Sequence, residues 1–95
     1  MIKLIMYDIE KDKTRTKLAR DLEAIGFTRI QYSVFLGNVK KHLIKDLIHK
    51  YRQKLALEDK LFSLNVSEKY VRDMVAIGFD EDLEGILKTR HTLFF

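Results

Sequence analysis

The sequence contains no cysteine among its 95 residues, which excludes disulfide bonds, a cysteine-ligated zinc site and a thiol nucleophile. It contains no run of about 20 apolar residues, the length that a membrane-spanning helix requires, and no signal peptide is visible. A glycine-rich phosphate-binding loop and a convincing Ser-His-Asp set are also missing. We therefore expect a cytoplasmic protein that does not contact a membrane.

The composition is that of one small globular domain with unevenly distributed charge. A chain of this length buries roughly 60% of its unfolded surface, so packing against a partner subunit would add useful stability. Residues 1–67 carry 14 Lys and Arg against 8 Asp and Glu, whereas residues 68–95 carry 4 against 6. A basic body with a mildly acidic tail indicates a polyanionic partner, nucleic acid first. The alternative is a basic surface that is only solvated.

The first quarter of the chain predicts a buried strand followed by a helix. Residues 2–8 are apolar on both faces, a pattern typical of a central strand that helices cover. A helix is predicted over residues 12–25. Asp12 can serve as its N-cap, because a short carboxylate accepts a hydrogen bond from the first turn, and Gly26 ends it.

The rest of the chain predicts a second helix and several strands. Residues 29–39 indicate either one bent strand or two short strands that turn near residues 32–33. The later elements are a helix over 40–56, a strand over 60–66, a single turn over 68–73, a short strand over 74–77, an acidic turn or short helix over 80–88 and a last strand over 91–95. This order predicts an α+β, ferredoxin-like βαββαβ fold over residues 1–78. Residues 79–95 form an extension of the same domain, whose apolar end should cover its own sheet or pair with a partner's.

Asp8 is the strongest candidate for a chemical role, because it ends the most apolar strand of the chain. Ligands in open α/β sheets commonly bind at such strand ends. Arg15 shares the buried face of the first helix at its first turn, which should bring its guanidinium close to Asp8, and the phenol of Tyr7 is nearby. Magnesium typically takes one or two protein carboxylates. A two-fold dimer would supply a second Asp8, with Glu10 and Asp12 as weaker local candidates.

Two helical stripes of positive charge are candidates for contacts with a nucleic-acid backbone. Such contacts need charge but no base readout. The residues are Lys13, Lys17 and Arg20 on the first helix, and Lys41, Lys45 and Arg52 on the second.

Taken together, these residues resemble the CRISPR-associated Cas2 family. The shared features are Tyr7-Asp8-Ile9 after an apolar strand, then Asp12, Arg15, Gly26-Phe27 and the segment RIQYSVFLG at residues 29–37. The resemblance is dense over residues 2–40 and continues more loosely to the VAIG segment at residues 75–78. It implies a homodimer in which this late strand extends the partner's sheet.

The resemblance also implies two roles. One is a magnesium- or manganese-dependent endonuclease that acts on RNA or double-stranded DNA, with Asp8 of each protomer at a metal between them. The family's active cleft maps onto Tyr7, Arg15, Arg29 and Phe35. The other role is architectural, in spacer acquisition, where the dimer bridges integrase dimers and holds the spacer duplex. The endonuclease hypothesis is the primary one, and a non-catalytic scaffold is its alternative.

Overall fold

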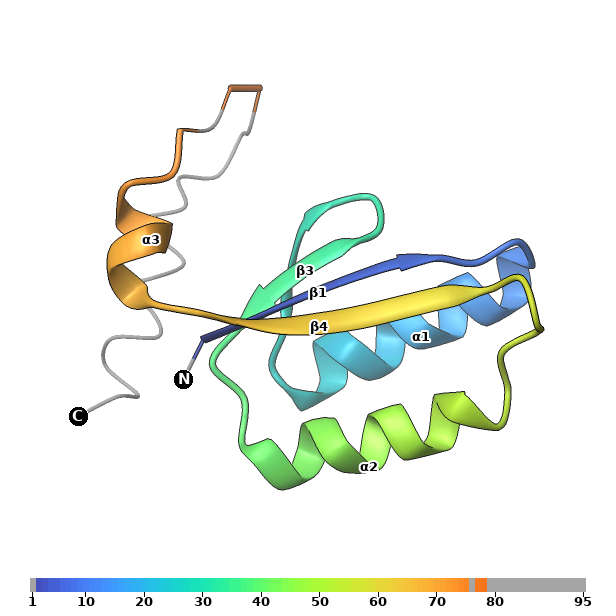
Figure 1. Cartoon of the computed structure of the whole chain (residues 1–95). Helices are drawn as coiled ribbons and strands as arrows, with labels where there is room; N and C mark the ends of the chain where they lie inside the picture. The colour runs from blue at the N-terminus through green and yellow to red at the C-terminus, as the bar shows by residue number, and fades with distance from the viewer. Residues whose placement is uncertain (1, 76, 79–95) are drawn as a thin grey trace.

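The computed structural model of the chain describes residues 2–75 and 77–78 (Figure 1). Its elements are β1 (Ile2–Asp8), α1 (Asp12–Ile25), β2 (Thr28–Gln31), β3 (Val34–Gly37), α2 (Lys41–Arg52), β4 (Lys60–Val66) and α3 (Glu68–Arg72). The predicted α+β, ferredoxin-like order is therefore confirmed. Within the described part of the chain, no helix is long and apolar enough to cross a membrane.

The four strands form one antiparallel sheet in the order β2-β3-β1-β4. Both long helices cover the same face of this sheet, as Figure 1 shows. β1 lies between two neighbours, so that Ile5 is paired with Phe35 on one side and with Ser63 on the other. This central place explains why β1 is apolar on both faces.

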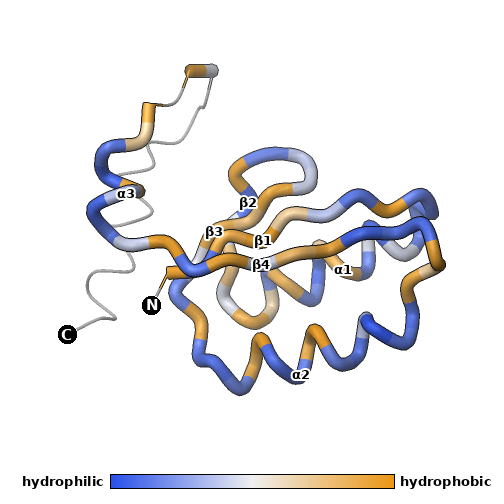
Figure 2. Tube along the Cα trace, in the orientation of Figure 1, coloured by the Kyte–Doolittle hydropathy of each residue, from blue (hydrophilic) through white to orange (hydrophobic). Residues whose placement is uncertain are grey.

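The main core lies between the sheet and the two long helices. β1 and β3 contribute Ile5 and Phe35, and α1 contributes Leu18 and Leu22, all four fully buried. In Figure 2 both helices alternate between apolar and polar residues along their length. The apolar residues of α2 and of the turn after it are buried in this core or packed against it: Leu43, Ile44, Leu47, Ile48, Tyr51 and Leu55.

The opposite face of the sheet is apolar but only partly covered. Successive side chains of a strand point to opposite faces, so Leu4 and its cross-strand partner Leu36 lie on this second face. Val71 of α3 packs over one end of it. Farther along β4, Phe62 and Leu64 keep 50% and 47% of their surface exposed. This face therefore presents an open apolar surface in the single chain.

The two alternatives for the β-rich segment are decided in favour of two strands. β2 and β3 form a hairpin that turns at residues 32–33, as the second alternative predicted. The pairing is irregular between Arg29 and Gln31, where the register shifts. The hairpin thus brings Arg29 opposite Phe35 and places Tyr32 at the tip.

Two local predictions were wrong. Helix α1 has Lys11 as its N-cap, without a side-chain capping bond, because the carboxylate of Asp12 forms an ion pair with Arg15 instead. Helix α2 ends at Arg52 rather than at residue 56. The amides of Lys54 and Leu55 both donate to the carbonyl of Tyr51, which turns the chain toward β4. The predicted helix end at Gly26 is confirmed, with a φ of 117° that favours glycine.

The late strand predicted over 74–77 does not form in the single chain at its described positions. Met74, Val75 and Ile77 are in no strand, and Val75 and Ile77 are 87% and 89% exposed. A strand needs a neighbouring edge to pair with. The predicted elements over 80–88 and 91–95 lie outside the described residues, so their structure stays a prediction.

Candidate functional site

Asp8 and Tyr7 are adjacent in sequence but serve opposite faces of the sheet. Tyr7 is buried on the side of α1 and α2, at 6% exposure. Asp8 is the last residue of β1, is exposed, and is paired with Lys60 of β4. Directly opposed residues of two strands present their side chains on the same face. The carboxylate of Asp8 therefore shares the open apolar face with the Lys60 side chain.

Arg15 lies at the end of β1, as the sequence predicted, but it holds the backbone there. Its Nη1 donates to the carbonyl oxygens of Ile9 at 2.7 Å and Glu10 at 3.0 Å. Its Nη2 forms the ion pair with Asp12. The guanidinium thus fixes the two residues that follow Asp8.

A second residue, which the sequence did not single out, holds the same loop from the other side. One carboxylate oxygen of Asp59 accepts from the amide of Glu10 at 3.1 Å, and the other accepts from the amide of Ala56 at 3.0 Å. Asp59 stands directly before β4, whose pairing with β1 places it beside the residues after Asp8. This contact follows from the β1–β4 register, which brings Lys60 opposite Asp8.

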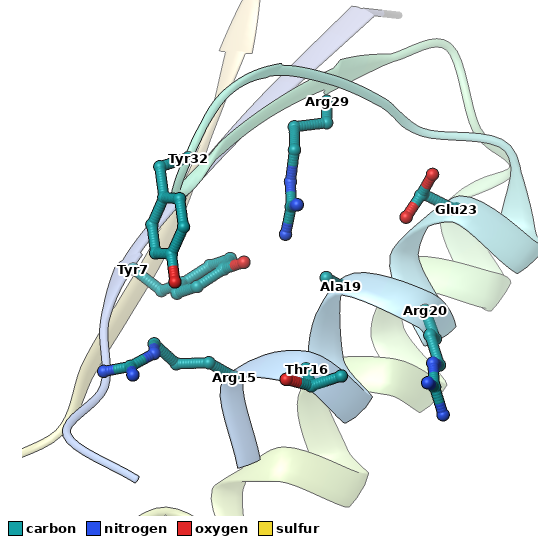
Figure 3. Close-up of a pocket in the computed structure, with 8 residues that line it drawn as sticks. All are labelled: Tyr7, Arg15, Thr16, Ala19, Arg20, Glu23, Arg29 and Tyr32. Atoms are coloured by element: carbon teal, nitrogen blue, oxygen red, sulfur yellow. The ribbon is translucent and has the colours of Figure 1, made fainter. Parts of the chain in front are cut away.

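On the helix side of the sheet, a cavity of about 250 Å³ lies between α1 and the β2–β3 hairpin (Figure 3). Helix α1 contributes its floor and outer wall, and the hairpin contributes the opposite wall. The lining side chains that carry charge or a hydroxyl are Tyr7, Arg15, Thr16, Arg20, Glu23, Arg29 and Tyr32. The cavity therefore collects three guanidinium groups, one carboxylate and two phenols.

Aromatic rings support the guanidinium of Arg29 in this cavity. Its Cζ lies 5.1 Å from the ring centroid of Phe35 and 5.7 Å from that of Tyr32. The ring of Phe35 in turn stacks on Tyr7, at 6.0 Å between centroids and 24° between planes. Four of the five predicted catalytic residues are thus brought together around one cavity. Asp8, the fifth, lies on the other face.

Asp8 is an exposed carboxylate that could bind a divalent metal, but the described part of the chain places few other ligands beside it. In residues 2–75 and 77–78, no group of three or more His, Asp or Glu side chains is arranged to hold a metal ion. Mg²⁺ or Mn²⁺ prefers oxygen ligands, and Mg²⁺ keeps several waters while it binds one or two carboxylates. The exposed Asp8 fits one such position.

The predicted basic side chains are all exposed, and one of them belongs to a tighter cluster between the two helices. Asp21 of α1 accepts from Lys50 Nζ at 3.0 Å and from the hydroxyl of Tyr51 at 2.7 Å. Lys17 and Lys54 flank this pair, and the contact with Lys17 lowers the pKa of Lys54 below its usual value. Lys50 and Lys54 were not predicted from the sequence, because Lys54 lies in the turn after α2 and joins the cluster only through the packing of α1 against α2.

The electrostatics of Asp21 and Tyr51 follow from the same contacts. Partial burial raises the pKa of Asp21, but the hydrogen bonds from Tyr51 and Lys50 and the charges of nearby lysines outweigh it and lower that pKa. Burial and the adjacent carboxylate raise the pKa of Tyr51 strongly. The carboxylate is thus charged and the phenol is neutral at physiological pH.

Comparisons with known proteins agree on one family. The family model described as CRISPR associated protein Cas2 matches residues 1–74. A CRISPR-associated endoribonuclease Cas2 from Pyrobaculum aerophilum is 42% identical over 53 residues, which cover 56% of this chain and 58% of that protein. Another from Aeropyrum pernix is 35% identical over 77 residues, 79% of this chain and 83% of that protein. The crystal structure of Streptococcus pyogenes Cas2 matches with a TM-score of 0.70 over 82% of this chain and 100% of that chain, at 23% identity, which shows a shared fold.

Proposed function

Because the chain belongs to the CRISPR-associated Cas2 family, we propose that it is a homodimeric, metal-dependent endonuclease that acts on RNA, double-stranded DNA or both. Relatives that carry the name endoribonuclease support the hydrolysis of a phosphodiester. The observation that carries the proposal is the placement of Asp8. It is an exposed carboxylate at the end of the central strand, and the loop after it is held by Arg15 and Asp59.

The open face of the sheet supports a dimer that pairs two copies of Asp8. Phe62 and Leu64 are half exposed on this face, and a second copy packed against it would bury them. Asp8 lies on the same face, so the two carboxylates would approach each other across the dimer. That arrangement supplies the one or two carboxylates that Mg²⁺ usually takes.

Three residues of this chain would have different roles at a bound phosphate. A divalent ion held by Asp8 would supply positive charge at the scissile phosphate. Lys60 lies opposite Asp8 in the β1–β4 register, and its ammonium group can bind a non-bridging phosphate oxygen on the same face. Arg15 keeps the backbone after Asp8 in place through the carbonyls of Ile9 and Glu10.

We also propose that the dimer is the integrase partner in spacer acquisition. This role needs a surface that binds a duplex irrespective of sequence. The lysines of the cluster between α1 and α2, together with the exposed cations of both helices, suit contacts with backbone phosphates. In the scaffold alternative this binding is the whole function, and Asp8 has no catalytic part.

The test compares the unmodified protein with Asp8→Asn on labelled RNA and on duplex DNA. Asparagine keeps the volume and one oxygen but removes the anion that binds a hard cation. We expect Asp8→Asn to abolish cleavage in Mg²⁺ or Mn²⁺ while dimerisation and duplex affinity stay within about twofold. Asp46→Asn removes the same charge from an exposed site on α2 and serves as the matched control. Equal cleavage by the unmodified protein and Asp8→Asn, or equal cleavage in chelator, would contradict the enzymatic role and leave the scaffold.

A further inference from the structure

We propose that the cavity between α1 and the β2–β3 hairpin is a binding site for one unpaired nucleotide, separate from the Asp8 face. The inference rests on the proposed function only in that the protein binds nucleic acid. It assigns Tyr7 and Arg29 to substrate recognition rather than to the chemistry at Asp8.

The position of the cavity separates it from the phosphate that Asp8 would contact. Tyr7 lines the cavity, and the next residue of the same strand, Asp8, points to the opposite face. Phe35 belongs to the helix-side core that backs the cavity. A group bound between α1 and the hairpin is therefore on the far side of the sheet from the carboxylate.

The guanidinium of Arg29 is held in position by aromatic rings, with its N–H groups available to a ligand. Its Cζ lies over the rings of Phe35 and Tyr32, and the guanidinium makes no hydrogen bond or ion pair with any other described residue. Stacking on rings leaves the N–H groups at the edge of a guanidinium available, and these groups suit a phosphate or the acceptor edge of a base. Arg15, in contrast, is already occupied by two carbonyls and Asp12.

The other walls provide what a base requires. In Figure 3 the side chain of Arg29 extends from β2 toward α1, with the rings of Tyr7 and Tyr32 on one side and Glu23 on the other. Tyr32 is 71% exposed at the hairpin tip, so one ring face can stack on a base. The carboxylate of Glu23 can only accept, and it complements the donors of Arg29 by taking an amino or imino N–H. A base edge carries both kinds of group.

The size of the cavity matches one unpaired nucleotide better than a base pair. Its volume of about 250 Å³ is just below the range of about 300–1,000 Å³ that is typical of small-molecule sites. That space suits one nucleobase with its sugar, but not a base pair. The exposed Arg20 on α1 lies at the edge of the cavity, where it can bind the attached phosphate. The site therefore selects single-stranded or bulged nucleic acid over an uninterrupted duplex.

The experiment measures binding of a labelled six-nucleotide RNA and of a blunt duplex by fluorescence anisotropy, in chelator to prevent cleavage. Tyr32→Ala should weaken binding of the single strand by about tenfold, the range expected for one lost base–aromatic contact. Arg29→Gln removes the charged donor to the phosphate or base edge and should weaken it by a similar factor. Binding of the duplex should change by less than about twofold. Arg52→Gln removes one positive charge from α2 and should weaken both ligands to the same small extent.

A bulged duplex with 2-aminopurine at the unpaired position gives a direct readout. Its fluorescence should be quenched on binding to the unmodified protein and to Asp8→Asn, but not on binding to Tyr32→Ala. Equal losses for single strand and duplex in the cavity variants, no loss in either, or no binding of the single strand at all would overturn the proposal. Retained cleavage by Asp8→Asn would contradict the proposed enzyme only, because the binding assay does not depend on catalysis. Since Tyr32 is exposed, its variant tests the site without disturbing the core.

Discussion

Replacing Asp59 with asparagine tests whether the loop after Asp8 must be held in place for activity. The carboxylate accepts one hydrogen bond from the Glu10 amide and one from the Ala56 amide. Asparagine keeps one accepting oxygen, but its NH₂ group would face the second N–H donor. One of the two hydrogen bonds is therefore lost, and with it the link between the β1–α1 loop and the start of β4.

The magnitude follows from the contacts. A hydrogen bond to a charged group contributes about 1.5–3 kcal/mol, and partial exposure of Asp59 lowers this to about 1 kcal/mol. For a domain of this size, that loss corresponds to a fall in Tm of about 4–8 °C. At 25 °C most molecules should remain folded, so the stability loss alone would lower metal-dependent cleavage only slightly. On the proposed function we expect a larger fall, because the backbone of the loop after Asp8 is no longer held in place.

The assay combines thermal unfolding by circular dichroism with a titration of Mg²⁺ against the cleavage rate. We expect Asp59→Asn to need more Mg²⁺ for half-maximal activity than the unmodified protein. Glu58→Gln, one residue earlier and exposed, removes the same charge and should behave like the unmodified protein. An unchanged Tm would refute the structural argument, and a lower Tm with an unchanged Mg²⁺ requirement would refute the link to Asp8.

Three further predictions concern acid stability, dimerisation and backbone binding. The lowered pKa of Asp21 means that its contribution to stability is present above its usual value of 3.8 and is lost as pH falls below it. Tyr51→Phe should thus cost about 1 kcal/mol in urea unfolding at pH 7 and clearly less at pH 3, and an equal cost at both pH values would contradict the charged hydrogen bond. Phe62→Asp should raise the dimer Kd at least tenfold by analytical ultracentrifugation, whereas Leu57→Asp, in the exposed α2–β4 loop, should not; equal constants would exclude the open sheet face as the interface. Neutralising the basic side chains of α2, which are Lys41, Lys45 and Arg52, should lower the salt slope of log K for duplex binding by roughly 0.9 per lost contact. An unchanged slope would show that the duplex binds elsewhere.

The order of the elements could be predicted because it depends on local patterns. Residues within one or two turns determine three of these features. They are the apolar strand β1, the apolar face of α2 and the end of α1 at Gly26. The Asp12 cap was wrong because Arg15 is a competing partner one turn away, and residue preference does not decide between them. The late strand is absent at Met74 and Val75, and strand pairing depends on contacts between distant residues that the local sequence does not determine.

The candidate site was predictable in its members but less so in its geometry. Tyr7 and Asp8 were expected to lie together, although the alternation of a strand already places neighbours on opposite faces. The contacts of Asp59 with the Glu10 amide, and of Lys50 with Asp21, join residues 49 and 29 positions apart. Such contacts depend on strand register and helix packing, which the sequence does not encode locally.

The opposite directions of Tyr7 and Asp8 set a lower limit on substrate length. A flexible strand that fills the cavity and also reaches Asp8 must pass around the carboxyl end of β1, over the loop that Arg15 and Asp59 hold. A substrate that occupies both places must be long enough to make this turn. Cleavage should therefore rise abruptly once an oligonucleotide is long enough to make this turn, and the cut should fall at a constant number of nucleotides from the base that the cavity holds. On this geometry, the adjacent residues Tyr7 and Asp8 of β1 determine the spacing between the bound base and the cleaved phosphodiester.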